Sequence, residues 1–304
     1  HKPDEAQSDA KRASVIDWYR STLLSRLDDP ANGPIILIQQ RVHEADLAGT
    51  LLEMGEWVHL DLPAIAEEPS EIEMGWRGTM VRVEGHLLHE ARLPGLLLDQ
   101  RRAELGSYVF AAQYQQRPAP TGGGLVKWDW FRTFARLPER RGGDRIVQSW
   151  DTASKAEESN DWSVCTTWLV RNQMAWLIAV SRAKLEFPEL RRRIVSEARH
   201  HNAGLVLIEE AGSGIQLLQE FRQSHEVSAT GLKPKDDKAT RLMAVSHLIE
   251  GGSISIPEDA PWMAEFRREI TLFPNGKYDD QVDSFSQFLK WFGEPKITPR
   301  IRIL

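Results

Sequence analysis

Carboxylates stand at three places in the second half of the sequence where a strand ends or a helix begins. They are Asp151, Glu209, and the group of Asp279, Asp280 and Asp283. Asp151 directly follows a predicted strand at 146–150, and Glu209 directly follows the apolar run at 205–208. Neighbouring strands that end on one edge of a sheet bring their terminal carboxylates within a few ångströms of one another. Such carboxylates repel unless they are protonated or bridged by cations.

Magnesium or manganese is the natural bridge for such a group, because hard divalent cations prefer oxygen ligands. Two ions about 3.5–4 Å apart activate a water molecule and stabilise the leaving oxygen during phosphodiester cleavage. Each acid by itself is also explained by a turn, a cap or the helix dipole. The prediction of nuclease chemistry therefore rests on the three places together.

The elements that must position these acids have a regular order. We expect a strand at 146–150 and then a hairpin of strands at 163–170 and 174–180. Further strands and helices follow; the expected strands are 205–208 and 253–256, and the expected helices are 188–200, 215–222, 237–250, 261–272 and 281–292. Three antiparallel strands followed by alternating strands and helices are the order of a ribonuclease H-like sheet. The predicted fold class is α/β, with a mixed ribonuclease H-like sheet flanked by helices.

The first half has a looser α/β pattern. Apolar spacing predicts helices at 6–27 and 44–54; an apolar run predicts a buried strand at 35–38, and a second short strand is expected at 57–62. Residues 67–121 show no clear strand ladder and are expected to form a connecting lobe. The Pro- and Gly-rich segment 118–124 is the best candidate linker. We therefore predict two domains, at 1–120 and 121–304.

Composition narrows the class of protein. The chain has 304 residues and a formal charge of −6, so it lacks the basic excess of a simple nucleic-acid coat or clamp. No apolar stretch approaches the roughly 20 residues that a membrane span needs, and no signal segment is evident. The single cysteine, Cys165, excludes an internal disulfide and a multi-cysteine metal site. A soluble intracellular protein with no membrane partner is expected.

Five segments carry the acids and their neighbours, at 148–153, 160–163, 207–214, 237–241 and 273–283. In sequence, order and spacing they resemble the nuclease domain of the large terminase subunit of tailed bacteriophages. Upstream, residues 38–49 resemble the late part of the terminase ATPase domain, and residues 110–118 resemble its junction with the nuclease. Val42 and Ala45 depart from the family, which usually has tryptophan and a second acid there. The resemblance covers nearly the whole chain.

The resemblance implies a DNA-packaging motor protein whose C-terminal domain cuts concatemeric double-stranded DNA with two Mg²⁺ or Mn²⁺ ions. Asp151, Glu209 and Asp280 match the family's metal-binding acids. Asp279 and Asp283 are close alternatives for the third site.

Other residues are assigned smaller roles in this comparison. Glu210 is the second choice for the middle acid, and Asp161 is a candidate outer partner. Lys238 and Arg241, one turn apart on a predicted helix, are expected to face the scissile phosphate or else to form a solvated helix face.

The upstream match implies the C-terminal part of a P-loop-type α/β ATPase domain. No segment has the G-x-x-x-x-G-K-[ST] pattern of a phosphate-binding loop, so we expect no ATP hydrolysis by this chain alone and ATP binding only in the full-length protein. Arg41 and His43 would lie in the segment that couples hydrolysis to movement. The implied partners are double-stranded DNA, the small terminase subunit and the portal protein of the procapsid. The implied location is the bacterial host cytoplasm, transiently at the portal and not in the mature virion.

Two alternatives stay open at this point. A transposase or integrase of the same fold would use the same acids for strand transfer, although the ATPase-like segment disfavours it. The other is a motor component whose nuclease half is inactive and only grips DNA.

Overall fold

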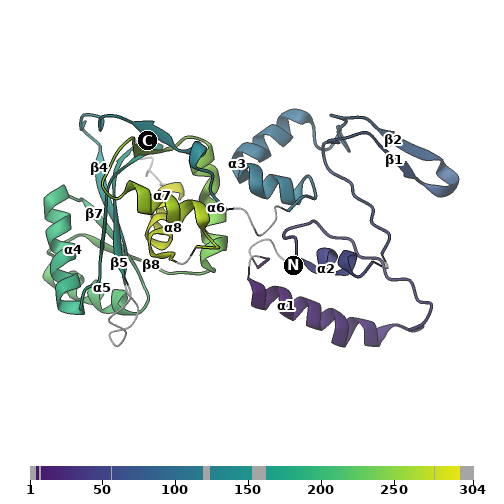
Figure 1. Ribbon diagram of the computed structural model, residues 1–304, viewed down its shortest axis with the longest axis horizontal. Helices are drawn as coiled ribbons and strands as arrows, with labels where there is room; N and C mark the ends of the chain where they lie inside the picture. The colour runs from purple at the N-terminus through teal and green to yellow at the C-terminus, as the bar shows by residue number, and fades with distance from the viewer. Residues whose placement is uncertain are drawn as a thin grey trace, which may run out of the picture. The chain divides into compact units, whose positions relative to one another are not determined.

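The structure is a computed structural model that describes residues 5–6, 8–55, 57–118, 124–152, 162–276 and 278–294. The chain divides into two compact units, His1–Gly123 and Gly124–Leu304, both drawn in Figure 1. The predicted boundary lies three residues earlier, and residues 119–123 of the predicted linker are outside the described residues.

The described part of the second unit is built on a seven-stranded mixed sheet in the order β3-β9-β6-β5-β4-β7-β8. Its strands are β3 (Arg132–Phe134), β4 (Arg145–Asp151), β5 (Ser163–Arg171), β6 (Met174–Ala183), β7 (Leu205–Glu209), β8 (Ala229–Leu232) and β9 (Ile254–Pro257). β4, β5 and β6 are antiparallel, whereas β7 is parallel to β4 and β8 is parallel to β7. The predicted ribonuclease H-like sheet is confirmed, and β3 and β8 are additions that the sequence did not predict.

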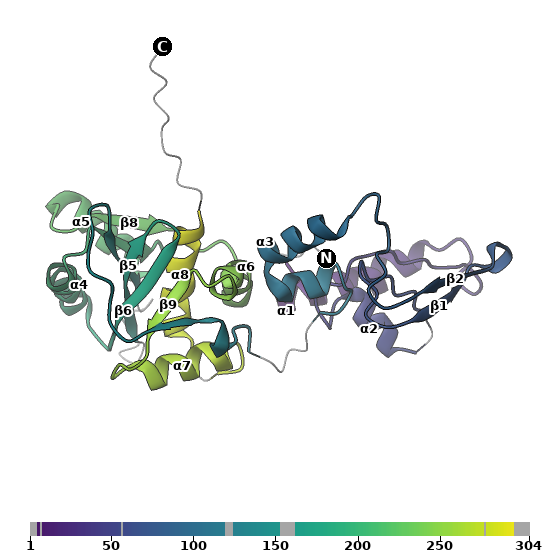
Figure 2. The same cartoon turned by 90° about the horizontal axis from the view of Figure 1, so that it is seen from above.

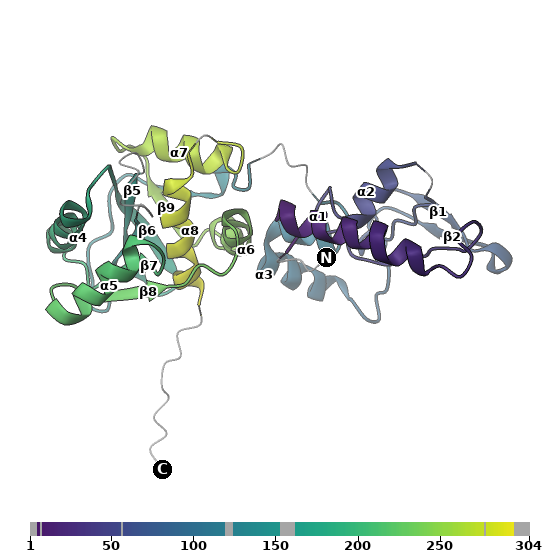
Figure 3. The same ribbon diagram turned by 90° about the horizontal axis from the view of Figure 1, so that it is seen from below.

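Helices cover both faces of this sheet, which is why the central strands are buried throughout. The helices are α4 (Phe187–His201), α5 (Ser213–Ser224), α6 (Lys238–Glu250), α7 (Met263–Leu272) and α8 (Asp280–Gly293). Figures 2 and 3 show α4 and α5 on one face and α8 on the other, with α6 and α7 packed against α8. On the α8 face, the Trp168 ring stacks on Phe288 with ring centroids 4.1 Å apart. α8 is therefore enclosed by the sheet and two helices, and its first turn lies at the ends of the strands.

The first unit has a helix, α1 (Asp9–Trp18), extended by a π turn at Tyr19–Leu23 and a 3-10 turn at Leu24–Arg26, followed by α2 (Leu47–Glu53). Residues 67–118 contain paired strands, so the prediction that this region has no clear strand ladder is corrected. They contain the antiparallel hairpin of β1 (Ser70–Glu73) and β2 (Thr79–Arg82) and the helix α3 (Gly95–Gln113). A short 3-10 turn lies at Gly75–Arg77, and another, in the second unit, lies at Trp128–Trp130. The apolar periodicity of α3 was hidden because the helix is interrupted at Gly106, where φ is +77°.

The predicted buried strands at 35–38 and 57–62 are also corrected. Both segments lack strand pairing in the described structure, although one side of each packs through Leu37 and Trp57 on the cluster of α1 and α2. The other side is open, since Ile38 is 91% and Val58 is 99% exposed. A strand needs a neighbour for its backbone hydrogen bonds, and neither segment finds one among the described residues.

The segment after residue 38 folds around a buried carboxylate. Asp46 accepts hydrogen bonds from Arg41 Nε at 3.1 Å, from the Val42 amide at 3.0 Å and from the Gly49 amide at 2.8 Å. A Cβ on Gly49 would lie 1.8 Å from the carbonyl oxygen of Glu44, so only glycine fits there. Arg41 is thus held in a fixed position at the start of α2. Among the described helices, none combines the length and the apolar character of a membrane span.

Candidate active site

Asp151 and Glu209 end two adjacent parallel strands. β4 and β7 pair with Trp150 opposite Ile208, so the next residue on each strand is one of the two acids. Trp150 and Ile208 are fully buried, which fixes both strand ends in the core. The structure therefore brings Asp151 and Glu209 side by side at one edge of the sheet.

The third group of acids lies at the start of α8, and buried polar contacts fix this helix on the sheet. Ser284 Oγ donates to the carbonyl oxygen of Ser149 at 2.8 Å. Gln287 Nε2 donates to Ser149 Oγ at 2.9 Å and to the carbonyl oxygen of Trp150 at 3.2 Å. Because Ser149 and Trp150 directly precede Asp151, α8 is attached to the strand that carries this acid.

Glu269 of α7 caps the first turn of α8, which has no side-chain cap of its own. Its carboxylate accepts hydrogen bonds from the backbone N–H of Gln281 and, at 2.7 Å, from Gln281 Nε2. Burial raises the pKa of Glu269, and the hydrogen bonds from Gln281 oppose that shift. No sequence pattern indicates this role, since the two partners lie on different helices.

Two cations of α6 connect the acids. Arg241 donates from Nη1 to Glu209 Oε2 at 3.0 Å and from Nη2 to Asp283 Oδ1 at 2.6 Å. Lys238 Nζ lies 2.8 Å from Asp279 Oδ1 and 2.5 Å from Asp283 Oδ2. The two residues predicted to face the scissile phosphate are thus ion-paired with acids in this structure.

Asp280 faces a different cation. Its Oδ2 lies 3.2 Å from Nη2 of Arg182 on β6, and the Arg182 guanidinium is stacked between Trp162 and Tyr278, at 4.3 and 5.1 Å from the ring centroids. Burial raises the pKa of Asp280, and the charge of Arg182 opposes that shift. The ion pair directs Asp280 toward β6.

Asp151, Glu209 and Asp283 form the group that we call the acid cluster. Burial, followed by the negative charges of Asp283 and Glu209, raises the pKa of Asp151 well above its ordinary value, and Lys238 opposes the shift. Asp280 acts on Asp151 too, but less than these groups do. Burial raises the pKa of Asp283 to about 6 against the charges of Lys238 and Arg241. Arg241 connects Asp283 to Glu209, whereas Asp280 pairs with Arg182, so the ion pairs include Asp283 in the cluster, and the role of Asp280 as the third acid stays a prediction.

The donor set of the acid cluster suits a hard divalent cation, since it consists of carboxylate oxygens. Among the described residues, no group of three or more Asp, Glu, His or Cys side chains is already arranged to hold a metal ion, and Arg241 instead bridges Glu209 and Asp283. Burial, more than any other cause, raises the pKa values of Asp151 and Asp283, so their ionised carboxylates lack the stabilisation that water would give them. A divalent ion would supply the missing positive charge, so the residues fit such an ion in their chemistry.

Glu210, the second choice for the middle acid, contacts β8. The amide of Glu210 donates to the carbonyl oxygen of Leu232 at 2.8 Å, and its side chain lies beside Gly231 on β8. Asp161, the candidate outer partner, is outside the described residues.

Residues 148–290 match the family model of the terminase ribonuclease H-like domain. This segment contains the acid cluster together with Lys238, Arg241 and Arg182. No curated protein matches the chain.

Solved structures of large terminases are similar to this chain. The large terminase of a thermophilic bacteriophage in complex with ATP-gamma-S has a TM-score of 0.51 at 12% identity, over 66% of this chain and 53% of that chain. The complex of the same terminase with ADP has a TM-score of 0.50 at 12% identity, over 66% of this chain and 52% of that one. The large terminase nuclease of the thermophilic phage G20c with bound magnesium has a TM-score of 0.43 at 14% identity, over 56% of this chain and 98% of that chain. The match spans about half the length of the large terminase that was solved with both nucleotides, and at this identity the likeness shows the fold alone.

Proposed function

We propose, on the premise that residues 148–290 match the terminase ribonuclease H-like domain, that this chain is part of a large terminase subunit and that its second unit is a divalent-metal-dependent endonuclease. Its substrate in this proposal is concatemeric double-stranded DNA during viral genome packaging. The observation that carries the proposal is the acid cluster, in which two adjacent strand ends and the first turn of α8 bring Asp151, Glu209 and Asp283 together.

In this proposal Asp151, Glu209 and Asp283 hold two Mg²⁺ or Mn²⁺ ions. Such ions, when bound, activate water for attack on the phosphodiester and stabilise the departing oxyanion. Glu269 and the contacts of Ser284 with β4 keep the first turn of α8 in place, and with it Asp283. Arg241 and Lys238 form ion pairs with the carboxylates of the cluster. Bound metal ions would take over this pairing, and the two side chains would then be available to contact the phosphate.

A plasmid-nicking assay with the full chain and Mn²⁺ tests the proposal. The parent should cut with little sequence preference, and excess chelator should stop it. Asp151→Asn should lose cleavage by at least about 100-fold, because a carboxylate of the metal site is lost, and its melting temperature should not fall below that of the parent. Asp236→Asn, which changes an exposed acid near the same site, is the matched control and should cut like the parent. Full activity of Asp151→Asn, or of the parent in chelator, would refute metal-dependent cleavage by this cluster.

One observation favours a second candidate function, a DNA-gripping unit without nuclease activity. Glu209 and Asp283 are paired with Arg241, and Lys238 pairs with Asp279 and Asp283, so most of the acid charge is already balanced without metal. DNA binding by the parent without any nicking in Mn²⁺ would support this second function.

For the first unit we propose the C-terminal part of an ATPase domain. The open apolar sides of the segments at 35–38 and 57–62 support this, because they are what strands of a larger sheet present when their neighbours are absent. ATP would then act only in the full-length protein, and steady-state ATP hydrolysis by this chain would contradict the assignment. The small terminase subunit and the portal protein are the proposed partners, in the host cytoplasm.

A further inference from the structure

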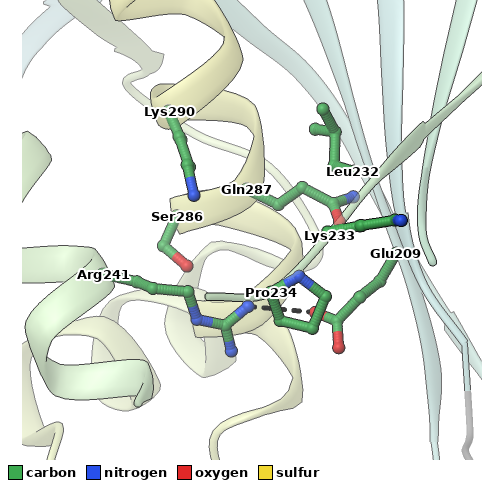
Figure 4. Close-up of a pocket in the computed structure, with 8 residues that line it drawn as sticks. All are labelled: Glu209, Leu232, Lys233, Pro234, Arg241, Ser286, Gln287 and Lys290. Carbon is green, nitrogen blue, oxygen red and sulfur yellow. Dashed lines mark hydrogen bonds and ion pairs between the residues drawn. The ribbon is translucent and has the colours of Figure 1, made fainter. Parts of the chain in front are cut away.

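A small, shallow pocket that opens to solvent lies directly beside the acid cluster. It is formed where the end of β7, the segment after β8, and helices α6 and α8 come together. Figure 4 shows its lining, which consists of Glu209, Leu232, Lys233, Pro234, Arg241, Ser286, Gln287 and Lys290. One wall of the pocket, Glu209, is thus also a member of the acid cluster.

The lining of the pocket is positively charged. It has three cations, Lys233, Arg241 and Lys290, and one carboxylate, Glu209, which is already paired with Arg241. Lys233 and Lys290 make no ion pair with another described residue. Figure 4 shows the ammonium group of Lys290 directed toward Ser286, whereas Lys233 lies on the Glu209 side of the pocket. The positive charge that remains is available to a ligand.

The α8 wall of the pocket is rigid. Gln287 is buried and bonded through Nε2 to Ser149 and Trp150 of β4, and Ser286 is buried with Oγ bonded to the carbonyl oxygen of Asp283 at 3.3 Å. Lys290 follows Ser286 by one helical turn and therefore projects from a fixed backbone. On this wall a ligand would meet a lysine whose backbone is held in place.

We propose that this pocket binds a backbone phosphate of DNA, next to the phosphate that lies at the acid cluster. The proposal rests on the proposed nuclease function. The pocket is a shallow depression that opens to solvent, so a phosphodiester group would lie at its mouth, in contact with the lysines, and not inside it. Lysine ammonium groups bind phosphate as point charges without reading the base, which agrees with cutting of little sequence preference.

The pocket would also offset the electrostatic repulsion between the acid cluster and the DNA backbone. A cluster of carboxylates repels the phosphates that it has to approach, and without metal nothing in the cluster itself attracts DNA. Cations one step along the strand provide that attraction at a defined position. In this scheme Lys233 and Lys290 position the substrate and do not take part in the chemical step.

The test measures DNA binding by fluorescence anisotropy with the full chain in chelator, where cleavage cannot occur. Lys290→Gln and Lys233→Gln are compared with the parent over a range of NaCl concentrations, and melting temperatures check that each variant is folded. Each variant should lower the slope of log K against log [salt] by about 0.9 and weaken binding about 5- to 10-fold near 0.1 M salt. Lys235→Gln is the matched control, since it removes an exposed lysine of the same loop that does not line the pocket, and its slope should equal that of the parent.

Parent-like slopes for both pocket variants would overturn the proposal, and so would an equal loss of slope in Lys235→Gln, because that would indicate general surface charge. Inorganic phosphate distinguishes a free-phosphate site. If it raises the melting temperature of the parent but not of Lys290→Gln while DNA binding is unchanged, the DNA assignment is refuted. If the parent shows the lysine-dependent salt slope and yet fails to nick DNA in Mn²⁺, that result would refute the nuclease function and support the phosphate site.

Discussion

Replacing Asp283 with asparagine should change how the stability of the metal-free protein depends on pH. Burial raises the pKa of Asp283 to about 6, whereas an aspartate in an unfolded chain has a pKa of about 3.9. The folded state therefore holds this proton more tightly than the unfolded state does. The parent should lose stability as the pH rises from about 4 to about 6, and the loss should be complete above that range. Asp283→Asn has no titrating group at this position, so it should not show this loss of stability.

The size of the effect follows from the pKa difference. A difference of about 2 corresponds to about 3 kcal/mol, and the Asp283 side chain is only 5% exposed, so screening by solvent is small. For a unit of this size, 1 kcal/mol shifts the melting temperature by about 2–4 °C. Asp283→Asn should therefore gain about 6–12 °C relative to the parent between pH 4 and pH 7. Asp151 acts in the same direction, because the Asp283 charge is the largest contribution to its raised pKa after burial.

The assay is thermal unfolding of the full chain, followed by tryptophan fluorescence in metal-free buffers from pH 4 to pH 8. Above about pH 6 the parent also has the ion pairs of ionised Asp283 with Lys238 and Arg241, which Asp283→Asn lacks, and their contribution is already contained in the pKa of about 6. The change from a carboxyl to an amide group adds an offset in melting temperature that does not depend on pH. The informative quantity is therefore how the difference in melting temperature between Asp283→Asn and the parent changes with pH. Asp236→Asn serves as the control and should run parallel to the parent. Parallel curves for Asp283→Asn as well would refute the argument that burial and crowding disfavour the ionised form of Asp283.

Asp280→Asn should weaken Mn²⁺ binding less than Asp283→Asn does, because Asp280 faces Arg182 and its charge affects the pKa of Asp151 less. Calorimetric titration with Mn²⁺ compares the two variants. The reverse order of affinities would support Asp280 as the third acid. Glu269→Ala should lower the free energy of unfolding by about 1–3 kcal/mol, because it leaves the buried amide of Gln281 without an acceptor. Urea unfolding measures that loss. Glu269→Gln keeps an acceptor and should lose less, and an alanine variant as stable as the parent would rule out the cap.

The centre of the nuclease sheet was predictable because its strands have distinct patterns. β4, β5 and β7 are short runs that are buried along most of their length, and each is followed by a polar turn or an acid. β3 and β8 were missed because they have only three and four residues, with no apolar alternation. They lie at the two edges of the sheet, where pairing with a single neighbour is enough to hold a strand.

The acid site was predictable in outline, but the choice among the acids of α8 was not. The positions of Asp151 and Glu209 follow from where their strands end. Which of Asp280 and Asp283 faces those strand ends depends on how α8 is rotated about its axis. That rotation is set by Ser284 and Gln287 through contacts with residues more than 130 positions earlier in the chain, and no local pattern records it.

The net charge of −6 is compatible with DNA binding because charge acts locally. At the proposed site, three carboxylates meet at the strand ends while Lys238, Arg241, Lys233 and Lys290 surround them from α6, α8 and the segment after β8. The Debye length at physiological ionic strength is about 8 Å, so a phosphate at the pocket responds to these groups and hardly to the acids elsewhere on the chain. Formal net charge therefore says little about whether this unit binds DNA. The relevant quantity is the order of charges along the path of the bound DNA strand. In the proposed arrangement, cations bind one phosphate, and the carboxylates, with metal bound, receive the next phosphate.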